Sequence, residues 1–108
     1  MTTLIVDARN VLRSQWPNIP ERDLVELVRA WAEREGVRPL IVFDGRPPVE
    51  AEDVVGTRSE TADDWIAREA AALAPYWLVT SDRELRERAG RDAERVIGGG
   101  SFARELTR

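Results

Sequence analysis

Aspartates close or follow three short apolar segments of this 108-residue sequence. Asp7 and Asp44 each end such a segment, and Asp82 follows a third one after Thr80 and Ser81. Short, nearly continuous apolar runs are typical of strands buried on both faces of a parallel sheet. In open α/β sheets the ligand lies beyond the carboxyl ends of the strands, where the strand order reverses. We therefore expect these carboxylates to belong to one site.

A fourth acid, Asp63, lies in the first turn of a predicted helix, three residues before Ile66. The helical repeat turns it toward the apolar face that packs on the sheet. Carboxylates gathered within a few ångströms repel one another unless protons or a cation intervene. Hard oxygen ligands of this kind suit Mg²⁺ or Mn²⁺, so a divalent cation is the simplest counter-charge.

Each of these polar residues also has an ordinary structural interpretation. An aspartate at a strand end is often a turn or helix-capping residue. Asn10 could cap a helix that begins at Val11, and Asp64 fits the capping-box position opposite Thr61. The Gly98–Gly100 run is better explained as a turn than as a phosphate-binding loop, because no Lys-Ser/Thr pair follows it.

The composition excludes several kinds of chemistry. The chain contains neither Cys nor His, which excludes thiolate nucleophiles, imidazole bases and the usual zinc sites. All 16 cationic residues are Arg, so a Schiff-base lysine and a receiver domain, which needs a lysine, are excluded as well. A net charge of −4 argues weakly against a general nucleic-acid binder, although local arginine clusters remain able to bind RNA.

Apolar periodicity predicts the elements that must position these residues. Strands are expected at 3–7, 40–44, 53–57, 76–80 and 94–97, and helices at 20–36, 61–75, 83–89 and from a cap at Ser101 onward. The order βαββαβαβα indicates a three-layer α/β/α sandwich with a mainly parallel five-stranded sheet, and the third strand should lie at an edge. The length fits a single domain spanning 1–108. Trp31 and Trp77 are expected in the core.

We expect the protein to be cytoplasmic and free of membranes. The first charged residue is the acid Asp7, unlike the basic start of a signal peptide, and no apolar run approaches the ~18 residues that span a bilayer. The absence of cysteine is compatible with a reducing compartment but does not require it.

Four segments, in order and context, carry a resemblance to a known family. They are Leu4-Ile5-Val6-Asp7-Ala8-Arg9-Asn10-Val11-Leu12, Val42-Phe43-Asp44, Glu60-Thr61-Ala62-Asp63-Asp64-Trp65-Ile66 and Val79-Thr80-Ser81-Asp82, and the segment at 99–106 adds a fifth match. Together they resemble the NYN domain of the PIN-like ribonucleases, and within it the bacterial YacP-like group. The resemblance implies the sheet order 3-2-1-4-5, which makes Asp7 and Asp82 neighbours.

The activity that this resemblance implies is hydrolysis of RNA phosphodiester bonds with Mg²⁺ or Mn²⁺, as in an endoribonuclease. The resemblance assigns catalytic roles to the metal-binding acids Asp7, Asp63 and Asp82 and to Asn10 on the substrate side. Asp44 and Asp64 are second-tier metal ligands. Thr80, Ser81, Arg9, Arg46 and Arg58 are candidates for supporting the site or binding substrate, with Arg13 and Arg83 as further cations and Trp16 or Trp65 as stacking candidates.

Alternatives to this function remain open at the level of the sequence. The family usually has Gly and then Tyr or Asn after the first Asp, where this chain has Ala8 and Arg9, so Arg9 either binds a phosphate or obstructs the site. The expected partner is single-stranded RNA or ribosome-associated mRNA. A non-catalytic RNA- or ribosome-binding regulatory module would keep the same fold, and so would the toxin of a toxin–antitoxin pair with a protein partner.

Overall fold

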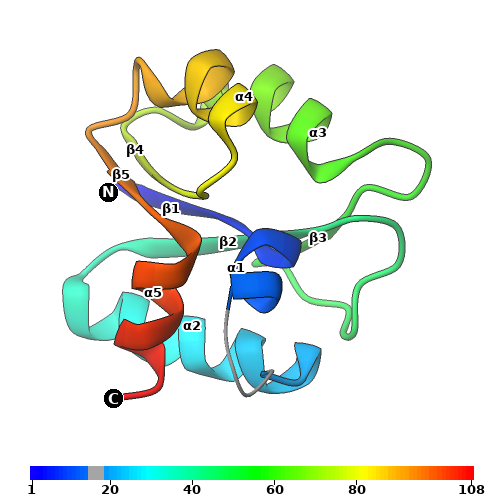
Figure 1. Cartoon of the computed structure of the whole chain (residues 1–108), viewed down its shortest axis with the longest axis vertical. Coiled ribbons are helices and arrows are strands. Elements are labelled where there is room, and N and C mark those ends of the chain that lie inside the picture. The colour runs from blue at the N-terminus through cyan, green and yellow to red at the C-terminus, as the bar shows by residue number, and fades with distance from the viewer. Residues whose placement is uncertain (15–18) are drawn as a thin grey trace.

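The computed structural model contains one five-stranded parallel sheet in the order β3-β2-β1-β4-β5 (Figure 1). The structure describes residues 1–14 and 19–108. Its strands are β1 (Thr3–Asp7), β2 (Arg38–Phe43), β3 (Val54–Gly56), β4 (Tyr76–Val79) and β5 (Arg95–Ile97). The parallel sheet, the strand order and the edge position of β3 are confirmed. The order reverses between β1 and β4, so their carboxyl ends form the switch point.

Helices cover both faces of the sheet, as the three-layer prediction requires (Figure 1). One face carries α1 (Ala8–Ser14), α2 (Glu21–Glu35) and α5 (Gly99–Leu106). The other carries α3 (Ala62–Glu69), the 3₁₀ segment η1 (Ala70–Leu73), α4 (Arg83–Leu85) and the π-helical turn η2 (Arg86–Gly90). Within the described part of the chain, no helix combines the length and the apolarity needed to cross a membrane.

Alternation along β1 assigns its side chains to two separate cores. Leu4 and Val6 pack with the residues beneath α1, α2 and α5, whereas Ile5 packs with those beneath α3 and α4. Trp31 is buried in the first core, as predicted, and Trp77 packs half-buried against it. Because successive side chains of a strand point to opposite faces, the residue after Val6 points toward the α3 face.

The crossover helix α2 forms as its sequence predicts. Pro20 precedes its first turn, and Gly36 ends it in the left-handed conformation, at φ 72°. Arg29 on this helix donates two hydrogen bonds, of 2.7 and 2.8 Å, to the carboxylate of Asp53. The same contact lowers the pKa of the Asp53 carboxyl. This pair holds the segment before the edge strand β3 against the helix layer.

Two helix starts were predicted wrongly. A helix begins at Ala8, directly after β1, so the element order has one helix more than predicted, and Asn10 lies within that helix rather than capping it. The last helix begins at Gly99, after Gly98, and not behind a Ser101 cap. At its first residue, α5 packs tightly against α1, since a Cβ at Gly99 would lie 2.1 Å from Asn10 Oδ1. Only glycine allows the start of α5 to approach α1 so closely, so the glycine run forms the first turn of this helix rather than a loop before it.

This contact makes a stability prediction. Gly99→Ala should lower the free energy of unfolding by about 1–3 kcal/mol, because the added methyl overlaps the Asn10 amide. Gly100→Ala is the matched control, since its Cβ would meet nothing closer than 3.6 Å. Alanine is the better helix former, so this control should be neutral or stabilising by up to about 1 kcal/mol. Urea denaturation measures both, and equal stabilities of the two variants would contradict the packing described.

Candidate functional site

A pocket of about 210 Å³ lies at the switch point of the sheet. Four carboxylates from four separate segments reach it: the end of β1, the loop after β2, the first turn of α3 and the residue before α4. The lining residues are Asp7, Arg9, Asn10, Arg13, Asp44, Thr61, Asp63 and Asp82. The structure thus brings together the three acids predicted as first-tier ligands, together with Asp44, Asn10 and Arg9.

Asp7 is the most buried of these acids, with only 4% of its surface exposed. Burial raises the pKa of its carboxyl to about 6, and the nearby charges of Asp63 and Asp44 act in the same direction. Hydrogen bonds from the Thr80 hydroxyl, at 3.0 Å, and from the Asn10 backbone N–H oppose this rise. The pocket therefore carries more negative charge than its surroundings balance.

Thr80 connects two of the acids. It is fully buried, so it supports the site from within and does not contact a substrate. Its hydroxyl donates to Asp7 Oδ2 and accepts a hydrogen bond of 3.1 Å from the backbone N–H of Asp82. Asp82 Oδ1 in turn accepts from Leu85 N at 2.9 Å, which caps α4. Asp82 therefore serves as a helix cap and still lines the pocket.

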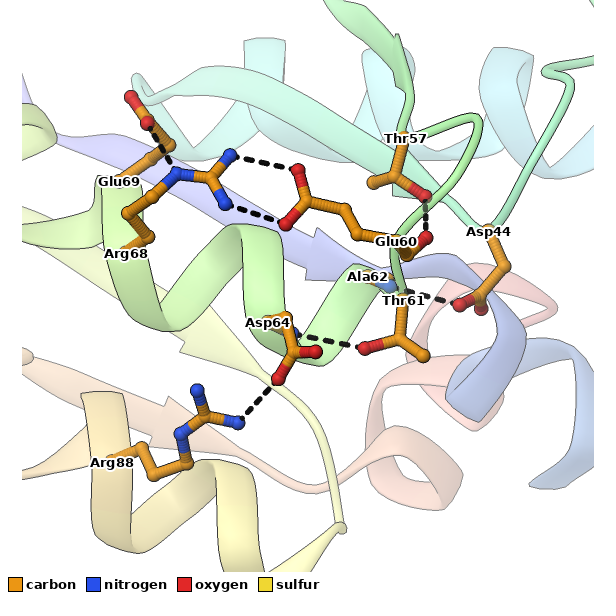
Figure 2. Close-up of polar contacts among 9 residues, drawn as sticks. All are labelled: Asp44, Thr57, Glu60, Thr61, Ala62, Asp64, Arg68, Glu69 and Arg88. Atoms are coloured by element: carbon orange, nitrogen blue, oxygen red, sulfur yellow. Dashed lines mark hydrogen bonds and ion pairs between the residues drawn. The ribbon is translucent and has the colours of Figure 1, made fainter.

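Asp63 is placed by the start of α3. The helix is capped by Thr61, whose hydroxyl accepts from Asp64 N, and Asp44 Oδ1 accepts a 2.8 Å hydrogen bond from Ala62 N (Figure 2). These two contacts fix the first turn on both sides of Asp63. Partial burial raises the pKa of the Asp63 carboxyl, and the charges of Asp82 and Asp44 raise it further.

Two features of this region were not predicted. Thr61 lines the pocket as well as capping α3, and Asp44 holds the Ala62 amide as well as facing the pocket. The spacing between Thr61 and Asp63 was visible in the sequence. No sequence pattern, however, indicates that the loop after β2 meets the start of α3.

Arg9 forms an ion pair at the edge of the pocket. Its Nε lies 3.2 Å from Asp44 Oδ2, and 55% of its side chain remains exposed. Arg13, one helical turn later, also lines the pocket. Among the described residues, the lining of the pocket contains two cationic side chains, those of Arg9 and Arg13, and four carboxylates.

Asn10 and Ser81 bind α1, the loop after β4 and α5 together. Ser81 N donates to Asn10 Oδ1 at 2.8 Å, and Gly99 N donates to Ser81 Oγ at the same distance. The amide oxygen of Asn10 is therefore committed to the protein itself. These bonds fix the loop that leads into Asp82.

The remaining candidates lie elsewhere. Asp64 is exposed and paired with Arg88 at 2.9 Å, on the side of α3 shown in Figure 2. Arg46 and Arg58 are exposed and do not belong to the described residues that line the pocket.

The two stacking candidates are also outside the pocket. Trp65 packs half-buried against the core beneath α3, and Trp16 falls outside the described residues. Arg83, the further cation named beside the acids, is exposed directly after Asp82.

The donor chemistry of the pocket fits a hard divalent cation. As the side chains stand, no three acids among residues 1–14 and 19–108 converge closely enough to hold an ion by themselves. Magnesium, however, is usually held by one or two carboxylates, with waters and substrate phosphate completing its shell. The buried carboxylate of Asp7 beside Asp63 and Asp82 meets that requirement.

Comparison with solved structures identifies the fold. The crystal structure of Rae1 (YacP) from Bacillus subtilis matches with a TM-score of 0.72 and 23% identity, covering 99% of this chain and 74% of that one. A point mutant of the same protein matches with a TM-score of 0.74 and 24% identity, covering 99% and 76%. No protein-family model matches the chain, and no curated protein matches its sequence. The chain therefore has a YacP-like fold.

The raised pKa of Asp7 makes a pH prediction. Because the folded state keeps this proton to about pH 6 and the unfolded state loses it near 3.8, stability should fall as pH rises between these values. Asp7→Asn mimics the protonated group and should raise the free energy of unfolding above pH 6 by up to about 3 kcal/mol in EDTA. The gain should vanish near pH 4. Urea denaturation across this range measures it.

A matched control separates this effect from a general change of charge. Glu87→Gln removes an exposed carboxylate on η2 and should change stability by less than about 0.5 kcal/mol at any pH. A gain for Asp7→Asn that persists unchanged at pH 4 would rule out titration of Asp7 as the cause.

Proposed function

We propose that this protein is a metal-dependent ribonuclease, an endoribonuclease that hydrolyses phosphodiester bonds of single-stranded RNA. The observation that carries the proposal is the pocket at the switch point, where the buried Asp7 shares a small volume with Asp63 and Asp82. The resemblance of the motifs around these acids to the NYN domain of PIN-like ribonucleases supports it. The YacP-like fold is consistent with that assignment.

Asp7, Asp63 and Asp82 would hold Mg²⁺ or Mn²⁺, with Asp44, which also lines the pocket, as a second-tier candidate. When bound, such an ion lowers the pKa of a water and stabilises charge on the reacting phosphate. Asp7 presents its carboxylate in the orientation that the Thr80 hydroxyl fixes. The same hydroxyl holds the Asp82 backbone, so one buried side chain sets the spacing of the two acids across the switch point.

The substrate side of the pocket is formed by α1. Arg9 and Arg13 face the acids and would bind phosphate oxygens, with Arg9 exchanging its bond to Asp44 for one to the substrate. Asn10 acts through Ser81, whose backbone it anchors beside Asp82. The proposed partner is single-stranded RNA or ribosome-associated mRNA, and the proposed location is the cytoplasm.

The central test is loss of the Asp7 carboxylate. Purified wild-type protein should cleave single-stranded RNA with Mn²⁺ or Mg²⁺, and EDTA should stop the reaction. Asp7→Asn should lower the rate at least about 100-fold, as expected when a group that stabilises the transition state is removed. Glu87→Gln should retain activity. Urea denaturation of the same samples checks that Asp7→Asn is folded, and unchanged cleavage in that variant would refute the assignment.

The ion pair between Arg9 and Asp44 favours one second candidate, a non-catalytic binding module. In that case Arg9 supplies the counter-charge of the pocket in place of a metal ion. Such a module would bind RNA equally well in EDTA and in Mn²⁺, and would not cleave it. The nuclease requires cleavage that depends on the ion.

Arg9 itself provides a further prediction. If Arg9 binds substrate phosphate, Arg9→Gln should raise KM for RNA about 10-fold and change kcat little, since one charge-assisted contact is lost. Steady-state kinetics on a fluorescent oligoribonucleotide measures both. A higher kcat in the variant would show that Arg9 obstructs the pocket rather than serving it.

A further inference from the structure

The arginines of the described residues differ in whether a carboxylate pairs with them. Arg68 is tied to Glu60 and Glu69, and Arg88 is tied to Asp64 (Figure 2). Arg9 of α1 is tied to Asp44. Within residues 1–14 and 19–108, no acid lies within ion-pair distance of Arg13, Arg95 or Arg104.

A groove of about 600 Å³ lies between β5 and α5. We call it the arginine groove, and its lining residues are Arg95, Ile97, Ser101, Arg104, Glu105, Thr107 and Arg108. Its one carboxylate, Glu105, is paired with Arg108 at 3.2 Å. The groove therefore carries two positive charges that no acid of its lining offsets, on a protein whose net charge is −4.

The two uncompensated guanidinium groups are held in place by neutral partners. The guanidinium carbon of Arg95 lies 4.9 Å from the centre of the Trp77 ring. That ring packs edge-on against the buried Trp31, at 6.3 Å. Arg104 donates a 3.3 Å hydrogen bond to Ser101 Oγ. Both arginines are thus partly ordered without losing charge, which lowers the entropic cost of binding an anion.

Helix α1, which lines the acid pocket, packs against α5, which lines the arginine groove. Gly100 sits at this contact, because a Cβ there would lie 3.7 Å from Ser14 Cβ and 3.6 Å from Arg104 Nη1. Ser14 directly follows Arg13, which lines the acid pocket. Figure 1 shows α1 and α5 side by side below the end of β5. The acid pocket and the arginine groove are therefore lined by two helices in direct contact.

We propose that the arginine groove binds the phosphate backbone of the RNA strand several nucleotides away from the bond that is cut. This proposal rests on the proposed function and names a second part of its substrate site. A pocket with four carboxylates repels a polyanion, so affinity for RNA must come from outside it. Guanidinium groups bind phosphate through two hydrogen bonds, and a base can stack on the open face of Arg95 above Trp77.

The test compares RNAs of two lengths in EDTA, where binding is measured without cleavage. Fluorescence anisotropy is recorded with labelled single strands of about 4 and about 12 nucleotides, the range of sites on single-strand-binding modules. Arg95→Gln/Arg104→Gln should weaken binding of the longer RNA about 10-fold or more. The shorter RNA should bind the wild type more weakly, and the same double variant should weaken its binding too, because in EDTA the acid pocket repels RNA and the groove is what attracts it. The salt dependence for the longer RNA should fall by about 1.4 in slope, for two lost phosphate contacts.

The matched control is Arg34→Gln/Arg38→Gln. These arginines are exposed and have no acid within ion-pair distance among the described residues. Arg34 lies in the last turn of α2 and Arg38 begins β2, and neither lines the arginine groove. The control changes net charge equally and should leave both affinities nearly unchanged. Equal losses of RNA affinity in the two double variants would overturn the proposal, because they would reflect the change in net charge alone. Arg104→Gln, which gives up only the Ser101 bond, tests the groove without disturbing Trp77.

Other outcomes identify other roles and overturn the proposal. If the groove variant binds both RNAs normally but loses binding to a poly-glutamate peptide, the groove serves an acidic protein. If it binds RNA normally and dimerises, the arginines protect the edge strand β5 from pairing. Failure of the proposed function is distinguishable, because wild-type protein would then bind the longer RNA through the groove and cleave nothing with Mn²⁺.

Discussion

Burial of one carboxylate among others at the switch point of the sheet is the constraint on which this structure depends. Asp7 is buried where β1 ends, and the strand order places the loop after β4 beside it. Burial and the charges of Asp63 and Asp44 both disfavour its ionised form. A fold optimised for stability alone would not retain this arrangement, since one apolar residue at position 7 would remove the cost. This cost supports the proposal of a cation site at these acids.

Hydrogen bonds to backbone segments and side chains hold these acids in place, and Arg9 pairs with Asp44. Thr80 spans Asp7 and Asp82, and Asp44 holds the first turn of α3 through Ala62. The Asn10–Ser81 bond does the same for the loop after β4. These bonds fix the segments that carry the acids before any cation arrives, and such preorganisation favours strong binding.

Negative and positive side chains are separated on the surface of the molecule. Four carboxylates are concentrated in a small hollow, whereas Arg95 and Arg104, without an ion pair among residues 1–14 and 19–108, line a separate groove. A net charge of −4 hides this separation, because the charge of a whole chain says little about a site a few ångströms wide. An acidic protein can in this way present one face suited to a polyanion and a pocket suited to its counter-ion.

The sequence by itself determined the layers, the parallel sheet and the edge of the sheet at which the aspartates lie. Apolar runs of strand length and the 3.6-residue repeat of α2 are local patterns, and the rule for the carboxyl ends of strands converts them into a place for Asp7 and Asp82. The strand order itself was predicted only through the family resemblance. Only the tertiary structure decided which polar atoms are already engaged.

The Asn10 amide is bonded to Ser81, Asp64 faces Arg88, and α5 begins two residues earlier than its apparent cap. These outcomes depend on contacts between segments up to 71 residues apart, and side-chain type alone does not specify them. The arginine groove was missed for the same reason. Arg95 and Arg104 lie on different elements, and only the packing of α5 beside the edge strand brings their charges into one groove.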